Sequence, residues 1–143
     1  IAKNTKIREV VINIRGNNCV IKIGENTTFG GARIVNVGID NSIHIGKNCL
    51  FSDHIEIWAS DTHSIFNNEA LMINHEKPIV IEDSVWVGSR VIILKGVTVG
   101  QGSVIGMGSM VTKDIEPYTI NVGNPSKKVK ESINWKLNYK EIK

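Results

Sequence analysis

A chain of 143 residues is long enough for one domain and too short for two separate hydrophobic cores. Its net charge of +3 is too small to indicate a nucleic-acid partner, and no apolar run approaches the roughly 20 residues of a membrane span. Because only 6% of its residues are aromatic, its core must be aliphatic. The N-terminus carries no secretory pattern, so we expect a single cytoplasmic domain over residues 1–143 without an integral membrane segment.

Residues 1–22 alternate weakly between apolar and polar types, which predicts the strands of an irregular capping coil. A clearer period begins at residue 23, and from Ile39 to Ile57 an apolar residue recurs every six positions. Two cysteines do not make a disulfide framework. Cys49 takes the small inner position of its hexad, so we expect it to be a buried core thiol.

The repeat stops at Asp61-Thr62-His63, and residues 63–78 fit no hexad before the period resumes at Ile79. An excursion of this length from a regular repeat is typical of a functional loop, because the repeats hold its two ends rigidly. His63 ends the last regular strand, and an imidazole can take a proton from a hydroxyl group near neutral pH. A surface histidine without function explains the pattern equally well.

Residues 81–116 are six consecutive hexads, each led by an aliphatic residue. The leaders are Ile81, Val87, Ile93, Val99, Ile105 and Val111. The fourth residue after each leader is small or β-branched, and glycine often follows the leader directly. A period of six matches neither an amphipathic helix nor a hairpin meander. It predicts one short parallel strand and one turn per hexad, with three hexads closing a coil of about 18 residues. The coils are expected over residues 23–125.

Residues 126–143 carry apolar residues at intervals of three to five, namely Val129, Ile133, Leu137 and Ile142. This spacing predicts a short amphipathic helix that closes the open end of the coil stack, with Trp135 packed there too. Lysines are concentrated in the same segment. A basic tail is either a solvated surface or a site for the phosphate groups of a ligand.

Five segments carry a family pattern. They are Ile81-Glu-Asp-Ser-Val-Trp86-Val-Gly88-Ser89, Lys95-Gly-Val-Thr-Val-Gly100, Val104-Ile-Gly-Met-Gly-Ser109, Val111-Thr-Lys-Asp114 and Gly123-Asn-Pro125. Together they resemble the hexapeptide-repeat acetyltransferases, in particular the branch that O-acetylates galactosides, maltose and the sugars of capsules or lipopolysaccharides. The resemblance implies an all-β fold, a left-handed parallel β-helix. It further implies a homotrimer with active sites between subunits, acetyl-CoA as co-substrate, no required metal, and a carbohydrate acceptor.

The resemblance also implies roles for individual residues. The segment Ser60-Asp61-Thr62-His63-Ser64-Ile65 is similar to the family segment that carries the general base, so His63 is predicted to deprotonate the acceptor hydroxyl for direct attack on acetyl-CoA. Asp61 either orients His63, contacts the sugar, or is a solvated turn residue. The residues implied to contact coenzyme A are Trp86, Ser89, Met107, Gly108, Thr112, Lys113, Lys127 and Lys130. Met107 stands where the family more often has alanine, and a packing role for Trp86 stays open.

Three other functions remain open at this stage. N-acetylation of an amino sugar on a nucleotide carrier uses the same chemistry, although such relatives commonly add an N-terminal nucleotide-binding domain. A metal enzyme of the γ-carbonic anhydrase type needs three converging histidines, and the spacing of His44, His54, His63 and His75 does not reproduce that pattern. A non-catalytic scaffold or ice-binding surface is typically built from flat threonine arrays without a long excursion.

Overall fold

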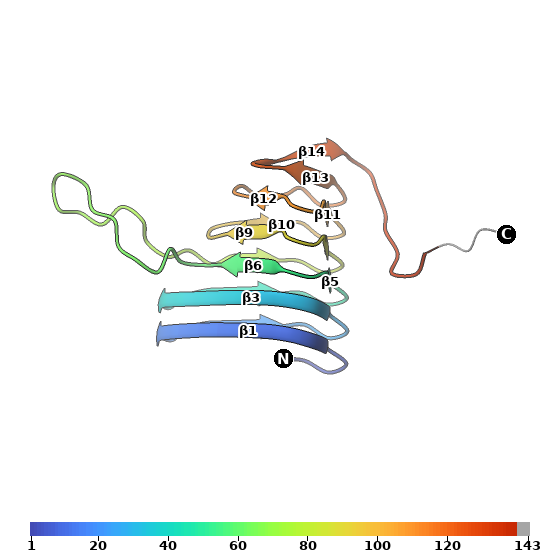
Figure 1. The fold of residues 1–143 in the computed structure, drawn as a ribbon, viewed down its shortest axis with the longest axis horizontal. Coiled ribbons are helices and arrows are strands. Elements are labelled where there is room, and N and C mark those ends of the chain that lie inside the picture. Colours follow the sequence, from blue (N-terminus) through green and yellow to red (C-terminus); the bar gives the residue numbers. More distant parts are fainter. Residues whose placement is uncertain (140–143) are drawn as a thin grey trace.

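The computed structural model describes residues 1–139 and shows an all-β solenoid of about five coils (Figure 1). Its strands are β1 (Lys6–Asn17), β2 (Val20–Ile23), β3 (Thr28–Ile39), β4 (Ser42–Ile45), β5 (Leu50–Phe51), β6 (Ile55–Trp58), β7 (Ile79–Ile81), β8 (Trp86–Val87), β9 (Ile92–Leu94), β10 (Thr98–Val99), β11 (Val104–Ile105), β12 (Met110–Val111), β13 (Ile120–Gly123) and β14 (Ser126–Lys130). None of its described segments is a helix long and apolar enough to cross a lipid bilayer.

The strands stack in three parallel faces. One face consists of β2, β4, β7 and β10. A second, which we call the C-terminal face, consists of β5, β8, β11, β13 and β14, and only its last pair, β13 with β14, is antiparallel. The third, which we call the loop face, consists of β6, β9 and β12. The long strand β3 joins the last two faces, because its start pairs with β5 and its later part pairs with β6.

The coil length confirms the predicted 18-residue repeat in the upper half of the stack. Trp86 pairs with Val104 and Ile92 with Met110, each across 18 positions. Lower coils are longer: Thr28 pairs with Leu50 across 22 positions, because β3 runs through a corner without a turn. The coil that contains the excursion is longer still, because His44 pairs with Val80 across 36 positions.

The core is the narrow aliphatic column that the hexads predict. All six predicted leaders are at most 1% exposed. The small inner positions are buried too, and the hydroxyls of Ser103 and Ser109 donate to the carbonyls of Gly100 and Gly106, both at 2.7 Å. Cys49 is 2% exposed, as expected for a core thiol. Lower in the stack the rings of Phe29 and Phe51 lie 4.4 Å apart and nearly parallel.

The opening segment is more regular than the weak alternation predicted. Strand β1 pairs with β3 from Lys6 to Asn17, so the first coil has a full-length strand. Ile7 and Ile12 pair with the buried Phe29 and Ile34 but are 41% and 43% exposed. They stay accessible because no further coil of the described chain lies beneath them.

The predicted C-terminal helix is wrong. Residues 126–130 form β14, and residues 131–139 are irregular; Ile142 lies outside the described residues. Strand β14 hydrogen-bonds to β13, whose edge would otherwise be unpaired at the top of the stack. The tail then descends along the side of the solenoid (Figure 1), and Trp135 docks there rather than over the open end.

Candidate active site

The excursion is an ordered hairpin that leaves the loop face after β6 and returns at β7. Figure 1 shows it, in green, projecting from the body of the solenoid. Phe66 and Met72 form an antiparallel bridge, and the Ile73 amide donates to the Ile65 carbonyl at 2.9 Å. The hairpin nevertheless exposes four large apolar side chains by 53 to 59%: Ile65, Phe66, Leu71 and Ile73.

A small polar cluster, which we call the loop-base clamp, closes the two ends of this hairpin. It consists of Asp61, Asn74 and Lys95. Lys95 Nζ donates to Asp61 Oδ2 at 2.6 Å and to the Asn74 carbonyl at 3.0 Å. Asn74 Nδ2 donates to Asp61 Oδ2 at 3.0 Å and to the His63 carbonyl at 2.8 Å. The hydrogen bond from Lys95 lowers the pKa of Asp61, so this carboxylate is charged at neutral pH.

His63 lies at the mouth of the hairpin with an exposed side chain. Its backbone is held by Asn74, whereas its imidazole makes no hydrogen bond within residues 1–139. The hydrogen bonds of the Asp61 carboxylate go to Lys95 and Asn74. Asn74 also donates to the His63 carbonyl, so Asp61 is linked through Asn74 to the backbone at the mouth of the hairpin.

A second feature is the corner between the C-terminal face and the loop face, which we call the Ser89 corner. It contains Asp53–His54, Ser89–Arg90 and Met107–Gly108 in successive coils, and the Gly108 amide donates to the Ser89 carbonyl at 2.9 Å. His54, Arg90 and Gly108 have φ angles of 57°, 60° and 75°, a left-handed turn repeated at each level.

The upper part of this corner is an open ledge. Met107 is 72% exposed, and a Cβ at Gly108 would meet no atom within 4 Å. Within the described chain, the backbone amides of Ser89 and Met107 donate no hydrogen bond. Two free N–H groups on an open ledge suit an extended ligand that carries carbonyl acceptors. The structure thus brings together Ser89, Met107 and Gly108, three of the residues predicted to contact coenzyme A.

The other predicted coenzyme A residues lie elsewhere. Thr112 and Lys113 follow β12 at the far edge of the loop face, above the hairpin. Lys127 and Lys130 are exposed on β14, where Lys127 pairs with Val122 near the top of the Ser89 corner.

Trp86 packs against Trp135 of its own chain, with ring centroids 5.9 Å apart. Trp135 Nε1 also donates to the Ser84 carbonyl at 2.6 Å. The tail therefore covers part of a side chain that is 38% exposed.

The two halves of the predicted site stand on opposite edges of the loop face. Arg90 begins that face and Lys95 ends it, and five extended residues span about 16 Å at roughly 3.3 Å per residue. The loop-base clamp carrying His63 lies at the Lys95 edge, and the open ledge lies at the Ser89 corner. Within one chain, His63 and the open ledge are therefore on opposite edges of the loop face and do not form one site.

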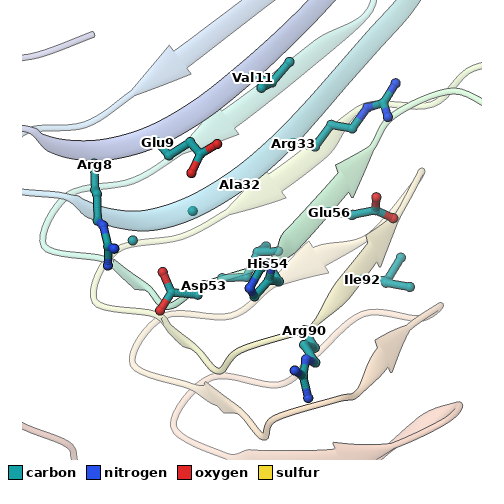
Figure 2. Close-up of a pocket in the computed structure, with 13 residues that line it drawn as sticks. Arg8, Glu9, Val11, Ala32, Arg33, Asp53, His54, Glu56, Arg90 and Ile92 are labelled. Carbon is teal, nitrogen blue, oxygen red and sulfur yellow. The ribbon is translucent and has the colours of Figure 1, made fainter.

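Below the ledge, the Ser89 corner continues into a groove of about 620 Å³ (Figure 2). We call it the arginine groove, because Arg8 of β1, Arg33 of β3 and Arg90 all line it. Glu9, Asp53, His54 and Glu56 also face it, so its walls are polar and carry both charges. The sequence analysis assigned no residue of this groove to the acetyltransferase site, and it considered His54 only for the carbonic anhydrase alternative.

A metal centre finds no support in the described part of the chain. No three side chains of histidine, cysteine, aspartate or glutamate come together there in a way that would hold a metal ion. A site shared between several subunits, as the carbonic anhydrase alternative requires, is a different arrangement.

Residues 78–113 match the family model described as the hexapeptide repeat of succinyl-transferase. The chain is 41% identical over 136 residues to the polysialic acid O-acetyltransferase of Escherichia coli O1:K1, covering 94% of this chain and 43% of that protein. It also aligns with the crystal structure of the polySia specific acetyltransferase NeuO, with a TM-score of 0.77, 32% identity, and coverage of 96% of this chain and 71% of that one. The chain belongs to the hexapeptide-repeat acetyltransferase family. The predicted resemblance is confirmed.

A third relative bears on the co-substrate. The hexapeptide-repeat acetyltransferase from Vibrio cholerae O1, complexed with acetyl coenzyme A, has a TM-score of 0.67 and 26% identity, covering 87% of this chain and 70% of that one. The chain spans 43 to 63% of the length of the curated relatives it matches.

Sequence reasoning missed Lys95 and Asn74 as partners of Asp61. Lys95 comes two positions after the leader Ile93, and the pairing of Trp58 with Leu94 puts it one coil above the start of the hairpin. Only the coil register, which depends on the length of the excursion, brings these residues together.

Proposed function

We propose that this protein is an acetyl-CoA-dependent O-acetyltransferase that acts on a hydroxyl group of a sugar in a surface polysaccharide. The observation that carries the proposal is the open ledge at the Ser89 corner, where two backbone amides lack an acceptor in the described chain. An extended pantetheine arm has amide carbonyls that these N–H groups can bind. Acetyl-CoA supplies the activated acetyl group.

The proposed reaction is a direct transfer. His63 removes the proton from the acceptor hydroxyl, and that oxygen forms a bond to the acetyl carbonyl carbon. The Ser89 N–H donates to the oxygen that becomes negatively charged. The carbon–sulfur bond then breaks, and His63 returns its proton to the departing thiolate. Asp61 is a positioning residue here, since it holds the loop base through Asn74 and Lys95.

A homotrimer is part of the proposal. His63 lies at the Lys95 edge of the loop face, which about 16 Å of extended strand separates from the Ser89 corner of the same chain, and this is too far for a proton transfer at hydrogen-bond distance. A neighbouring copy that presents its Ser89 corner to this hairpin removes that separation. The four exposed apolar side chains of the hairpin fit such a contact, because an apolar patch exposed on a monomer is typical of an interface. We also assign the family's left-handed winding to these coils.

The remaining predicted donor residues take supporting roles. Lys127 and Lys130, both exposed, bind the phosphate groups of the co-substrate as point charges. Thr112, Lys113 and Trp86 line the path of the co-substrate in the assembled trimer. Lys128 is less suited to phosphate, because it already pairs with Glu116 and Glu131.

Acetyl transfer from acetyl-CoA to a panel of hydroxyl-only sugars, amino sugars and bacterial polysaccharides tests the function. We expect ester formation on a hydroxyl group, and replacement of His63 by alanine should lower kcat by at least about 100-fold. His75→Ala is the matched control, because His75 is an exposed histidine in the same hairpin. Light scattering should give three times the 15.8 kDa chain mass for all three proteins.

Two results would count against this proposal. Near-normal turnover by the His63→Ala protein removes His63 from the mechanism. Amide formation on an amino sugar, without ester formation on any hydroxyl, replaces O-acetylation by the N-acetylation alternative.

A further inference from the structure

The arginine groove exists because the backbone of β3 lacks side chains where it passes the corner. Gly30 and Gly31 form its floor, opposite Asp53 and His54 of the coil above. A Cβ at Gly30 would lie 2.6 Å from Asp53 Oδ1, so a side chain at this position would displace the Asp53 carboxylate. At Gly31 the nearest atom would be 3.5 Å away, which is ordinary contact distance. The volume of about 620 Å³ lies within the usual range for ligand-binding clefts.

Three arginine residues from three different coils line this groove. Figure 2 shows Arg8, Arg33 and Arg90 around its rim. None of them forms an ion pair within 4 Å among residues 1–139. Arg33 lies over the ring of Trp58, 5.3 Å from the ring centroid, and this contact restrains its side chain. The groove therefore offers three cationic donors that no carboxylate of the described chain neutralises directly.

The three carboxylates in the same groove narrow the choice of ligand. Glu9, Asp53 and Glu56 would repel a compact anion such as inorganic phosphate. A neutral sugar would leave the three guanidinium groups without an anionic partner. A sugar that carries both a carboxylate and hydroxyl groups suits the arginines and the acidic residues of the groove. Arginine binds a carboxylate in a bidentate manner, and glutamate or aspartate accepts hydrogen bonds from hydroxyl groups.

We propose that the arginine groove binds an acidic glycan, with Arg8, Arg33 and Arg90 holding its carboxylate groups. This inference rests on the proposed function in one respect: the glycan bound here is the acetyl acceptor. Arg90 directly follows Ser89, so the groove opens onto the ledge proposed for the thioester. A sugar seated in the groove presents its hydroxyl groups toward that ledge, and the arginines decide that the acceptor is acidic rather than neutral.

Isothermal titration calorimetry with two probes tests the proposal: a sialic acid hexamer and the same hexamer with its carboxyl groups reduced to alcohols. We expect Arg8→Gln and Arg90→Gln each to lower the affinity for the acidic hexamer by about tenfold, because each variant loses a hydrogen bond between a guanidinium group and a carboxylate. The double variant leaves Arg33 and its contact with Trp58 intact. Gly31→Leu, which fills the groove without a charge change, should abolish binding.

Arg15→Gln is the matched control, because Arg15 is an exposed arginine of β1, the strand that carries Arg8, and it does not line the groove. Its affinity for the acidic hexamer should equal that of the wild type. The proposal is overturned if the wild type binds the reduced hexamer as tightly as the acidic one, if it does not bind the acidic hexamer, or if the double variant keeps wild-type affinity.

Acetyl transfer separates this inference from the proposed function. If the wild type binds the acidic hexamer through these arginines but acetylates no glycan, the glycan-binding inference holds and the proposed acetyltransferase function is refuted. If the wild type acetylates glycans and the Arg8→Gln and Arg90→Gln double variant has an unchanged KM, the proposed function holds and the glycan-binding inference is refuted.

Discussion

Replacing Asn74 by alanine tests whether the loop-base clamp holds the hairpin in place. The Asn74 side chain accepts from the Ile65 amide at 2.6 Å and donates to Asp61 and to the His63 carbonyl. Each such bond contributes about 0.5–1.5 kcal/mol, and the lower half of that range applies to this partly exposed site. Losing all three should cost about 2 kcal/mol of the free energy that keeps the hairpin closed.

Hydrogen exchange measures this loss directly. A change of about 2 kcal/mol corresponds to roughly 30-fold faster exchange of amides that exchange through hairpin opening. The Ile73 amide is the best probe, because it bonds to the Ile65 carbonyl and not to the replaced side chain. The exchange of core amides in β9 should stay unchanged, because the hairpin opens without unfolding the coils.

Asn68→Ala is the control for this experiment, since Asn68 lies near the hairpin tip and its side chain makes no hydrogen bond in the described chain. We expect less than about a twofold effect from it. If Asn74→Ala changes the Ile73 exchange rate by less than about threefold, the clamp does not hold the hairpin and the positioning role of Asp61 is also lost.

Two further predictions follow from the ionisable groups. The folded-state pKa of Asp61 is lowered, so the stability from its contact with Lys95 is fully present above the unfolded-state pKa of about 3.9 and is lost as the pH falls through the folded-state value. Ile73 exchange, corrected for its intrinsic pH dependence, should therefore accelerate below about pH 4 in the wild type but not in Asp61→Asn; the same acceleration in both would exclude Asp61 as the cause. Burial raises the pKa of the Cys49 thiol to about 11, so at pH 8 a thiol reagent should modify Cys19 in the folded protein and Cys49 only after unfolding. Native-state reaction of a Cys19→Ser variant at the rate of a free thiol would contradict this assignment.

Local features of the sequence were sufficient to predict the coils. Aliphatic and small residues recur at fixed positions of a six-residue pattern, which predicts which side chains point into the core. Ile93 and Ser109 occupy two such positions, and both are buried as the pattern predicts. The same pattern located the excursion by its interruption at His63. In a repeat protein the local sequence of each repeat is sufficient to determine its own strand and turn, and here each repeat is only six residues long.

The tail shows where such local reasoning fails. The spacing of Val129 and Leu137 suits a helix in isolation, but both residues are exposed, at 61% and 68%. The edge of β13 offered backbone hydrogen bonds to β14, and the ring of Trp86 offered a surface to Trp135. Neither partner is visible in the spacing of the tail itself, because both are contacts with other coils.

By itself, then, the sequence determined the six-residue strand-and-turn unit of the solenoid and the position of the excursion, and it identified His63 at the start of that excursion. The tertiary structure alone decided which coil lies above which, and hence that Lys95 meets Asp61 and that arginines from three coils surround one groove. The physical reason is that contacts between coils depend on the number of residues in each turn. Among the described residues that number ranges from 16 to 36, and no single hexad specifies it.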